Sequence, residues 1–338
     1  MAVQPARSFD EAIAVKPLSS HTYAATLRLE WCIGTVPHGG YITSAFLNVA
    51  CTHMRLNHPT RHNGCADPMT MHLTFLRRTE AGPATFRVED TKLGARTSTL
   101  HITLSQTDKN GGLREEVAAY ITMSNFDTEE GPSMVTGFEL TPKPEPGSGG
   151  SAPVDLAKLA RDGKDGAWSQ FAVAFTSMRT ASKQLEIYTP KSLERVKRGF
   201  VEQWVRFKPY GSLAPWTNPA LGFLVDMFPM MLETFDSKPW EKKQEQKKED
   251  GTRRFWYPTV LLNVEFKKRL PKEGVQWLYS RVHTKTLHNG RMDLDIVVLD
   301  EAGDIVALSN HVALVVGAER NTSERGSNGN GNGKSIKL

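Results

Sequence analysis

The sequence of 338 residues predicts an α+β protein of two similar units, each an antiparallel sheet wrapped around one central helix. Three observations support this prediction. An apolar segment with helical spacing is followed by segments that alternate apolar and polar residues, the same order occurs twice, and a stretch rich in Pro, Gly and Ser separates the two halves. The length suits two domains of ordinary size, and 39% hydrophobic residues suffice for their cores.

The first half begins with an apolar helix. In GGYITSAFLNVACTHM (39–54) apolar residues recur at helical spacing and few charges interrupt them, so we expect a helix that is buried nearly all round. Next, MTMHLTFL (69–76) alternates apolar and polar residues, as a strand with one buried face does. The same alternation predicts three further strands, in TFRVED (85–90), TSTLHITLSQ (97–106) and VAAYITMSNF (117–126).

The second half repeats this order. An apolar helix is expected in LGFLVDMFPMMLETF (221–235), and strands in TVLLNVEF (259–266), QWLYSRVHT (276–284), MDLDIVVLD (292–300) and IVALSNHVALVV (305–316). Short stretches also match between the halves, for example HLTFLRR (72–78) and NVEFKKR (263–269). This internal duplication predicts two units of one plan, whose sheets can join side by side into one long curved sheet.

Composition also predicts the domain boundaries. The stretch TPKPEPGSGGSAP (141–153) has no periodicity and few apolar residues, which is typical of a linker. A charge run at 237–254 is expected to be a mobile, solvated insert, with a docking surface as the alternative. We therefore expect an N-terminal domain at 1–141, a linker at 142–166, a C-terminal domain at 167–317 and a disordered polar tail at 318–338.

Charge and cysteine usage narrow the class of protein. A formal net charge of +5 is compatible with an anionic ligand, but no nucleic-acid-binding motif accompanies it. Three cysteines without a CxxC pair indicate a reducing compartment, and neither a signal-peptide pattern nor an 18-residue apolar run is present. We expect a cytoplasmic protein without a membrane span. The C-terminal Ser-Ile-Lys-Leu only partly matches a peroxisomal signal, so that location is less favoured.

The chain resembles the double-hotdog acyl-CoA thioesterases of the acyl-CoA thioesterase II type, from about Leu27 to Val316. Four segments carry the resemblance: HGGYITSAFLNVA (38–50), LGFLVDMF (221–228), PTVLLNVEF (258–266) and DEAGDIVALSNHVALV (300–315). The resemblance implies a tandem hotdog fold and hydrolysis of acyl-CoA or carrier-bound acyl thioesters in lipid or polyketide metabolism. It implies no cofactor and no metal. A homo-oligomer stays open, because hotdog sheets commonly pair further.

The resemblance also implies three catalytic positions. The family uses an aspartate on the second central helix, a threonine on the next strand and a glutamine on the last strand. These positions hold Asp226, Thr259 and His311, and the histidine is a departure because an imidazole can titrate whereas an amide cannot.

The residues themselves point to the same positions. Asp226 is the only charged residue between Leu221 and Leu232, on a segment whose pattern predicts burial, so it is either a tuned general base or a structural brace. The Thr259 hydroxyl can hold the attacking water or an oxyanion, although a β-branched residue also simply suits a strand. His311 is in phase with Ser309 and Ala313, which is equally compatible with a hydrogen-bonded structural histidine.

Seven further residues are expected to contact substrate. His38, Gly39 and Gly40 precede or open the first helix, where free backbone N–H groups favour a developing oxyanion; a tight helix start is the structural alternative. Asn263 is expected beside Thr259, because the two residues are in phase on one strand. Basic residues end equivalent strands in the two halves and can meet the phosphates of coenzyme A, namely Arg77, Arg78 and Lys268.

Other chemistries lack their motifs. The sequence contains no G-x-S-x-G elbow, P-loop, dinucleotide glycine motif or HExxH zinc motif. Two alternatives to a hydrolase stay open. The first keeps the fold and is an acyl-thioester binding protein or a non-hydrolytic tailoring enzyme, such as a cyclase or dehydratase. The second is an interaction protein that recruits a partner through the basic insert around Lys242 to Lys248.

Overall fold

The computed structural model describes residues 8–148, 150, 152–173, 177–191, 199–228, 255–317 and 319–322. The predicted charged insert at 237–254 lies outside these residues and stays a prediction. The same holds for nearly all of the predicted tail at 318–338. Its described part, Glu319–Thr322, forms the short helix α7, so the tail is not without structure from its start.

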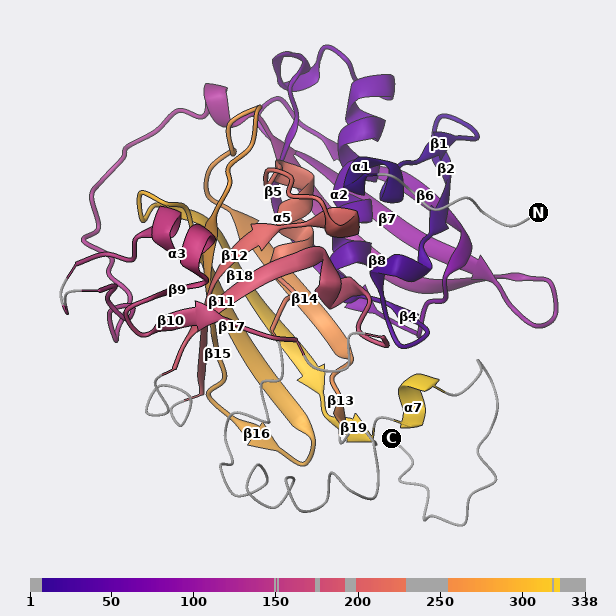
Figure 1. The fold of residues 1–338 in the computed structure, drawn as a ribbon. Coiled ribbons are helices and arrows are strands. Elements are labelled where there is room, and N and C mark those ends of the chain that lie inside the picture. The colour runs from indigo at the N-terminus through magenta and orange to yellow at the C-terminus, as the bar shows by residue number, and fades with distance from the viewer. Residues whose placement is uncertain are drawn as a thin grey trace.

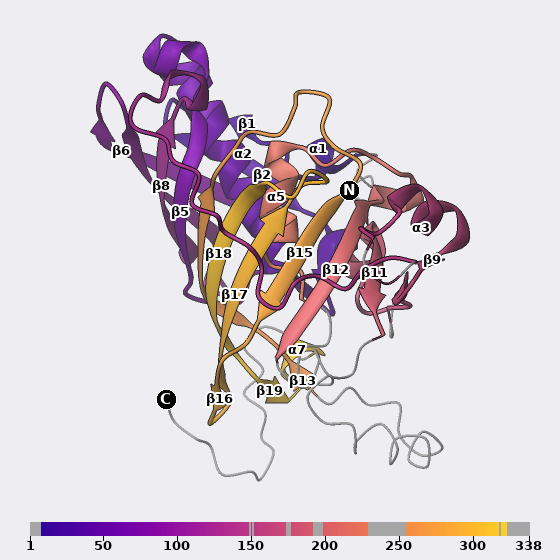
Figure 2. The ribbon, with the colours of Figure 1, turned by 90° about the vertical axis from the view of Figure 1, so that its left-hand side faces the viewer.

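Within the described residues, fifteen strands form one continuous antiparallel sheet to which both halves of the chain contribute (Figures 1 and 2). The two halves meet where β5 pairs with β14, for example Leu73 beside Leu262. The two predicted sheets are therefore joined into one. The strands of the first half are, in spatial order, β1 Lys16–Pro17, β2 Thr22–Leu27, β6 Gly82–Leu93, β7 Ser98–Thr107, β8 Leu113–Ser124 and β5 Asp67–Phe75.

The second half continues the sheet from β14 outward. Its strands are β14 Thr259–Phe266, β18 Ile305–Leu314, β17 Arg291–Leu299, β15 Leu278–His283, β12 Phe200–Phe207, β11 Leu185–Pro190, β10 Trp168–Gln170 and β9 Lys164–Asp165, with β16 Leu287–His288 paired to β17. Two small ribbons lie apart from this sheet, β3 Cys32–Ile33 with β4 Val36–Pro37 and β13 Phe255–Trp256 with β19 Val316–Gly317. Strands β2, β11 and β12 were not predicted from the alternation of apolar residues.

Two helices lie side by side against one face of the sheet (Figure 1). Helix α2, Gly39–Asn57, is buried over most of its length, as its apolar pattern predicts. Helix α5 spans only Asn218–Leu224 within the described chain, and Pro219 suits its first turn because the missing N–H is not needed there. The helix predicted over 221–235 instead begins earlier and ends at Leu224, so the prediction that Asp226 lies on it is wrong; residues 229–235 lie outside the described chain. No helix among the described residues is long and apolar enough to cross a membrane.

Glycines allow α2 and α5 to touch backbone to backbone. A Cβ at Gly40 would lie 2.6 Å from the carbonyl oxygen of Phe223, and a Cβ at Gly222 would lie 2.8 Å from the backbone nitrogen of Ser44. Both distances are shorter than any real carbon contact, so a side chain at either position would push the helices apart. The glycines therefore bring the start of α2 next to the end of α5, which is where the candidate site lies.

The main core is shared by both halves. Trp31 from the first half packs on Phe207 and Phe223 from the second, with ring centroids 6.1 and 5.0 Å apart, and its indole N–H donates to the hydroxyl of Tyr210 at 2.8 Å. Burying an aromatic side chain of this size contributes about 1.5–3 kcal/mol. The short helix α1, Phe9–Ala12, adds Phe9 to the same cluster, so each half completes the core of the other.

The predicted linker at 142–166 contains regular structure. Helix α3, Leu156–Asp162, begins with Asp155, whose side chain accepts from the backbone N–H of Lys158, and ends at Gly163 in the left-handed conformation. Strand β9 follows and forms one edge of the sheet. Leu159 of α3 is fully buried with Trp168 and Tyr279 in a second apolar cluster. The second half of the predicted linker is thus part of the folded structure, and a helix of about two turns with one buried leucine was too short to recognise in the sequence.

Candidate active site

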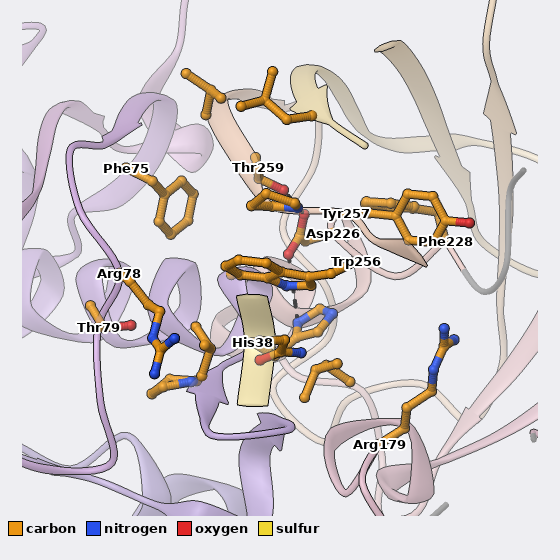
Figure 3. A pocket seen from close by; sticks show the side chains of 18 of the residues that line it. His38, Phe75, Arg78, Thr79, Arg179, Asp226, Phe228, Trp256, Tyr257 and Thr259 are labelled. Atoms are coloured by element: carbon orange, nitrogen blue, oxygen red, sulfur yellow. Dashed lines mark hydrogen bonds and ion pairs between the residues drawn. The ribbon is translucent and has the colours of Figure 1, made fainter. Parts of the chain in front are cut away.

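Asp226 lies in the turn after α5, where the end of that helix meets the start of α2. It is 4% exposed. Its carboxyl oxygens are 3.6 Å from Nδ1 of His38, 3.5 Å from Nδ1 of His311 and 3.0 Å from the hydroxyl of Thr259. Figure 3 shows the carboxyl between Thr259 and His38, at the wall of a cavity. The three predicted catalytic residues are therefore brought together, from the turn after α5, from β14 and from β18.

The pKa of Asp226 is raised from 3.8 to about 7 by burial, because a charged carboxylate loses its hydration there. Hydrogen bonds from the Thr259 hydroxyl and the Gly40 backbone N–H favour the charged form and limit the rise. The positive end of the α2 dipole acts in the same direction. At neutral pH the carboxyl is thus close to half-ionised, which suits a group that must both accept and return a proton.

Thr259 owes its position to a β-bulge at the start of β14. The register with β18 shifts between Thr259 and Leu261, so the residues before and after the bulge do not follow one alternation. The hydroxyl of Thr259 consequently reaches Asp226, whereas Asn263 bonds His72 at 2.6 Å and Asn310 at 2.8 Å. The prediction that Thr259 and Asn263 share a face is wrong, and Asn263 does not line the cavity.

His311 lies on β18 with its side chain buried on the same face as Ser309 and Ala313, as predicted. The Ser309 hydroxyl donates to the carbonyl of Asn263 at 2.6 Å, so it can only accept from Nε2 of His311, 2.9 Å away. The hydrogen-bond network thereby assigns the proton to Nε2. Nδ1 then carries a lone pair, has no hydrogen-bond partner among the described residues and faces Asp226.

His38 is the N-cap of α2. Its Nδ1 accepts from the backbone N–H of Gly40 at 3.1 Å, which assigns the ring proton to Nε2. Burial lowers the pKa of both His38 and His311 to about 3, and the Arg179 cation adds to this effect at His38. Both imidazoles are therefore neutral near pH 7. Asp226 is flanked by two nitrogen lone pairs, so neither imidazole stabilises its negative charge.

Gly39 is required by the close approach of Asp226 to the helix start. A Cβ at this position would lie 2.5 Å from Oδ2 of Asp226 and 3.2 Å from the ring of Phe75. The backbone N–H of Gly40 is engaged by its neighbours, whereas the N–H of Gly39 belongs to the first turn, where no intrahelical acceptor exists. The close approach of Asp226 therefore explains why position 39 is a glycine, and the role of this helix start in binding substrate stays a prediction.

The carboxyl of Asp226 opens onto a cavity of about 290 Å³. Its wall is mainly apolar and aromatic and includes basic side chains, of which Figure 3 shows Arg78 and Arg179 on opposite sides of His38. The lining residues that matter here are Phe75, Trp256, Tyr257, Arg77, Arg78 and Arg179. An apolar chamber with one titratable carboxyl and basic groups nearby suits an acyl chain that is carried on an anionic group.

The predicted basic residues do not act together. Arg77 and Arg78 follow the end of β5 and line the cavity, as expected of residues that meet a ligand. Lys268 follows the end of β14 and instead forms ion pairs with Asp300 and Asp304, outside the cavity. Since β5 and β14 are antiparallel neighbours, their carboxyl ends lie at opposite ends of the strand pair. The prediction that Lys268 contacts the same ligand as Arg77 and Arg78 is therefore wrong.

Family comparisons match both halves of the chain. The model of the acyl-CoA thioesterase N-terminal domain matches residues 27–124, and that of the acyl-CoA thioesterase C-terminal domain matches residues 140–315. The chain belongs to the acyl-CoA thioesterase family. The resemblance seen in the sequence is thereby confirmed.

Comparisons with individual proteins agree with this family assignment. It is 36% identical to the thioesterase-like protein TwmA of Talaromyces wortmannii, with 94% of each chain covered. A conserved protein of unknown function with a hot dog fold from Alicyclobacillus acidocaldarius has a TM-score of 0.67 at 16% identity, over 92% of this chain and 99% of that one. Acyl-CoA thioesterase II TesB2 from Mycobacterium marinum has a TM-score of 0.58 at 15% identity, over 92% and 98%. The fold is thus that of hotdog proteins.

Sequence reasoning missed several residues of this thioesterase-family site. Phe75 was recognised only as a buried strand residue, and Trp256 and Tyr257 lie before β14 in an aromatic run, FWYP, that was not considered. Arg179 lies in a stretch without periodicity and faces the cavity near His38 (Figure 3). An aromatic run directly before a site strand is the one signal that was available for these residues.

Proposed function

We propose that this chain hydrolyses acyl thioesters, with Asp226 as the base that activates water. The strongest support is its buried carboxyl at the cavity wall, whose pKa lies near 7. A base with that pKa can remove a proton from water and later return it. Family membership supports the same reaction. The two halves are proposed to be tandem hotdog units, each with its own central helix.

The proposed reaction begins with a water held by Asp226 and Thr259. The carboxylate accepts a proton from this water while the water oxygen attacks the thioester carbonyl carbon. The negative charge that develops on the carbonyl oxygen is met by the backbone N–H of Gly39 at the positive end of α2. Collapse of the tetrahedral intermediate breaks the carbon–sulfur bond. The proton on Asp226 passes to the departing sulfur, which yields a carboxylic acid and a thiol and restores the base.

His311 is proposed to position and tune Asp226 rather than to act on the substrate. Its Nδ1 lone pair, 3.5 Å from Oδ1, can accept a hydrogen bond from the protonated carboxyl but cannot donate one to the carboxylate. It therefore favours the proton on Asp226 and keeps the pKa high. A glutamine amide at this position would donate to the carboxylate and lower the pKa. The imidazole thus suits a base that works near neutral pH.

The basic residues are proposed to bind the anionic carrier of the acyl group. Arg77, Arg78 and Arg179 line the cavity, and arginine matches phosphate and carboxylate oxygens through paired N–H donors. The aromatic wall formed by Trp256 and Tyr257 is proposed to cover the acyl portion or the adenine ring. The substrate is therefore proposed to be an acyl-CoA, or an acyl group on the phosphopantetheine of a carrier protein.

Incubation with a panel of acyl-CoAs and a thiol reagent tests the reaction. The wild type is expected to release free thiol. Asp226→Asn is expected to lose about a hundred- to ten-thousandfold in rate, as enzymes do without their general base, while retaining the fold. Asp304→Asn is the matched control. Asp304 is an exposed aspartate paired with Lys268, outside the cavity, so this variant should retain the wild-type rate.

Other outcomes identify the alternatives. Binding of acyl-CoA without thiol release in the wild type would indicate a binding protein, and a changed acyl group without thiol release would indicate a tailoring enzyme. Near-normal thiol release by Asp226→Asn would show that another residue activates water. Deletion of residues 241–250, which removes part of the basic insert, should leave thiol release unchanged unless that insert serves the reaction.

A further inference from the structure

Four titratable side chains converge at the opposite end of α2 from the candidate active site. The carboxyl oxygens of Asp90 lie 3.3 Å from Nε2 of His21, 2.9 Å from Nε2 of His53 and 2.9 Å from Nε2 of His58. All three imidazoles point the same ring nitrogen at one carboxylate. This His-Asp cluster plays no part in the reaction proposed above.

Three separate elements bring the cluster together. His53 lies in the last turns of α2 and His58 is its C-cap, His21 directly precedes β2, and Asp90 lies on β6, which pairs with β2. On β6 the side chains of Phe86 and Val88 are buried beneath α2, and Asp90 continues the same alternation. The bulge after Asp90 ends this alternation. The carboxylate is thus directed at the end of the helix rather than at solvent, and its side chain is only 18% exposed.

The electrostatics of this position call for a cation. The C-terminal end of a helix carries the negative end of its dipole, so a carboxylate beside it is disfavoured unless a positive charge lies between them. Every ion pair of Asp90 within the described chain is to a histidine, and none is to a lysine or arginine. His53 is fully buried, so adding a proton to its ring is a costly way to supply that charge.

The outer nitrogens of two rings lie beside hydroxyl groups, which are partners that metal-binding histidines can use. Nδ1 of His53 lies 2.9 Å from the hydroxyl of Tyr23 and 3.2 Å from the amide nitrogen of Asn57. The Tyr23 hydroxyl donates to the carbonyl of Ser20 and so can accept an N–H from the ring, whereas the Asn57 amide nitrogen can only donate. Nδ1 of His21 lies 2.8 Å from the hydroxyl of Ser20. Metal-binding histidines commonly donate their second N–H to such a partner, which leaves the inner nitrogen free to bind the ion. Both inner nitrogens face Asp90.

We propose that His21, His53 and Asp90 form a binding site for a divalent cation of the zinc type, with His58 or water as the fourth ligand. Their ligand atoms all lie within 4.8 Å of one another. Zinc binds imidazole nitrogen and carboxylate oxygen at about 2.0–2.2 Å, which separates tetrahedral ligands by about 3.4 Å. The His21–Asp90 distance of 3.3 Å already matches, and the other two contacts need to open by a few tenths of an ångström. Imidazole-rich sites prefer zinc to magnesium or calcium.

The expected role of this site is structural. A bound ion would tie the last turns of α2 to β6 and to the segment before β2, and the helical rise from Gly39 to His53 and His58 places it about 21–28 Å from the Asp226 end. The sequence predicted no metal because the ligands are spread from residue 21 to residue 90 and form no compact motif. The site is independent of the proposed hydrolysis.

The test is zinc binding by the full chain after treatment with a chelator. Calorimetric titration with Zn²⁺ should give one strong site per chain, and Co²⁺ should give the intense visible absorption of tetrahedral coordination. His21→Ala and Asp90→Asn should each weaken Zn²⁺ binding at least tenfold. His21 is 45% exposed, so its replacement is compatible with folding even if a change at Asp90 is not. His101→Ala, a histidine on β7 outside the cluster, is the matched control and should bind like the wild type.

Thermal unfolding provides a second readout. Zn²⁺ should raise the unfolding midpoint of the wild type and of His101→Ala but not that of His21→Ala, because an ion bound only to the folded state stabilises it. Thiol release from acyl-CoA should be the same with and without chelator. The proposal is overturned if the wild type binds Zn²⁺ no more tightly than His21→Ala and Asp90→Asn, or if all four proteins bind it equally.

Discussion

Replacing Asp226 with asparagine is expected to stabilise the protein, and increasingly so as the pH rises. The carboxyl has a pKa of about 7 when folded and 3.8 in its unperturbed form. As the pH rises from about 4 through 7, the unfolded chain releases this proton first, so the folded state loses stability over that range. The difference between 3.8 and about 7 corresponds to about 4 kcal/mol, reached above pH 7. The loss is absent below pH 4, where both states hold the proton.

An asparagine cannot lose a proton, and its groups match the site. With its amide nitrogen in place of Oδ1, the side chain can donate to the Nδ1 lone pair of His311 and to the hydroxyl oxygen of Thr259, while its carbonyl oxygen takes the place of Oδ2. Asp226→Asn should therefore resemble the wild type at pH 4 and exceed it by about 4 kcal/mol near pH 8. Comparing the two proteins at each pH also removes the effect of the two histidines, whose lowered pKa destabilises both proteins alike as the pH falls below 6.5.

Denaturant unfolding at several pH values between 4 and 9 measures this difference. The free energy of unfolding of the wild type should fall relative to Asp226→Asn as the pH rises, with most of the change between pH 4 and 7. A constant difference between the two proteins, or a lower stability of Asp226→Asn at pH 8, would refute the conclusion that burial keeps this carboxyl protonated. It would also remove the physical basis for a base with a pKa near 7.

Three further predictions concern catalysis. In the wild type, kcat/KM should fall about tenfold per pH unit below about 7 because Asp226 becomes protonated, while both histidines stay neutral. His311→Gln should keep activity but move this fall in kcat/KM to lower pH. An unchanged pH profile would contradict the assigned tautomer of His311. Thr259→Val should reduce kcat about ten- to a thousandfold, because it removes the hydroxyl that holds the water and bonds the Asp226 carboxylate. Thr259→Ser keeps a hydroxyl and should retain most of the wild-type kcat. Equal kcat values for the two variants would count against the role of the hydroxyl. Gly39→Ala should lower kcat/KM about a hundredfold because its Cβ would displace the Asp226 carboxyl, with circular dichroism as the check on folding; full activity would exclude the close approach described here.

Much of the fold follows from local pattern. The apolar spacing of α2, the alternation of β14 and β18 and the repeated order of elements were readable because each buried face imposes its own period on the sequence. Strands β11 and β12 escaped prediction, since the alternation was not recognised in their segments. Helix α3 escaped because a single buried leucine, Leu159, supports it.

The candidate site was predictable in part for a similar reason. A single carboxylate in an apolar run, Asp226, is costly to bury and therefore conspicuous, and the family resemblance supplied Thr259 and His311. The face on which a side chain lies was less secure. One extra residue in the bulge of β14 places Thr259 and Asn263 on different faces of the sheet, and the local sequence pattern does not indicate this bulge.

Only the tertiary structure decided which distant residues meet. Because β5 and β14 pair antiparallel, Arg77 and Lys268 lie at opposite ends of this strand pair, although their sequence positions look equivalent. The hydrogen bond of Ser309 to a carbonyl on the neighbouring strand sets the tautomer of His311 and thus the electrostatics around Asp226. Period and composition are local properties of the chain, whereas proton positions and charge pairs depend on contacts between segments far apart in it.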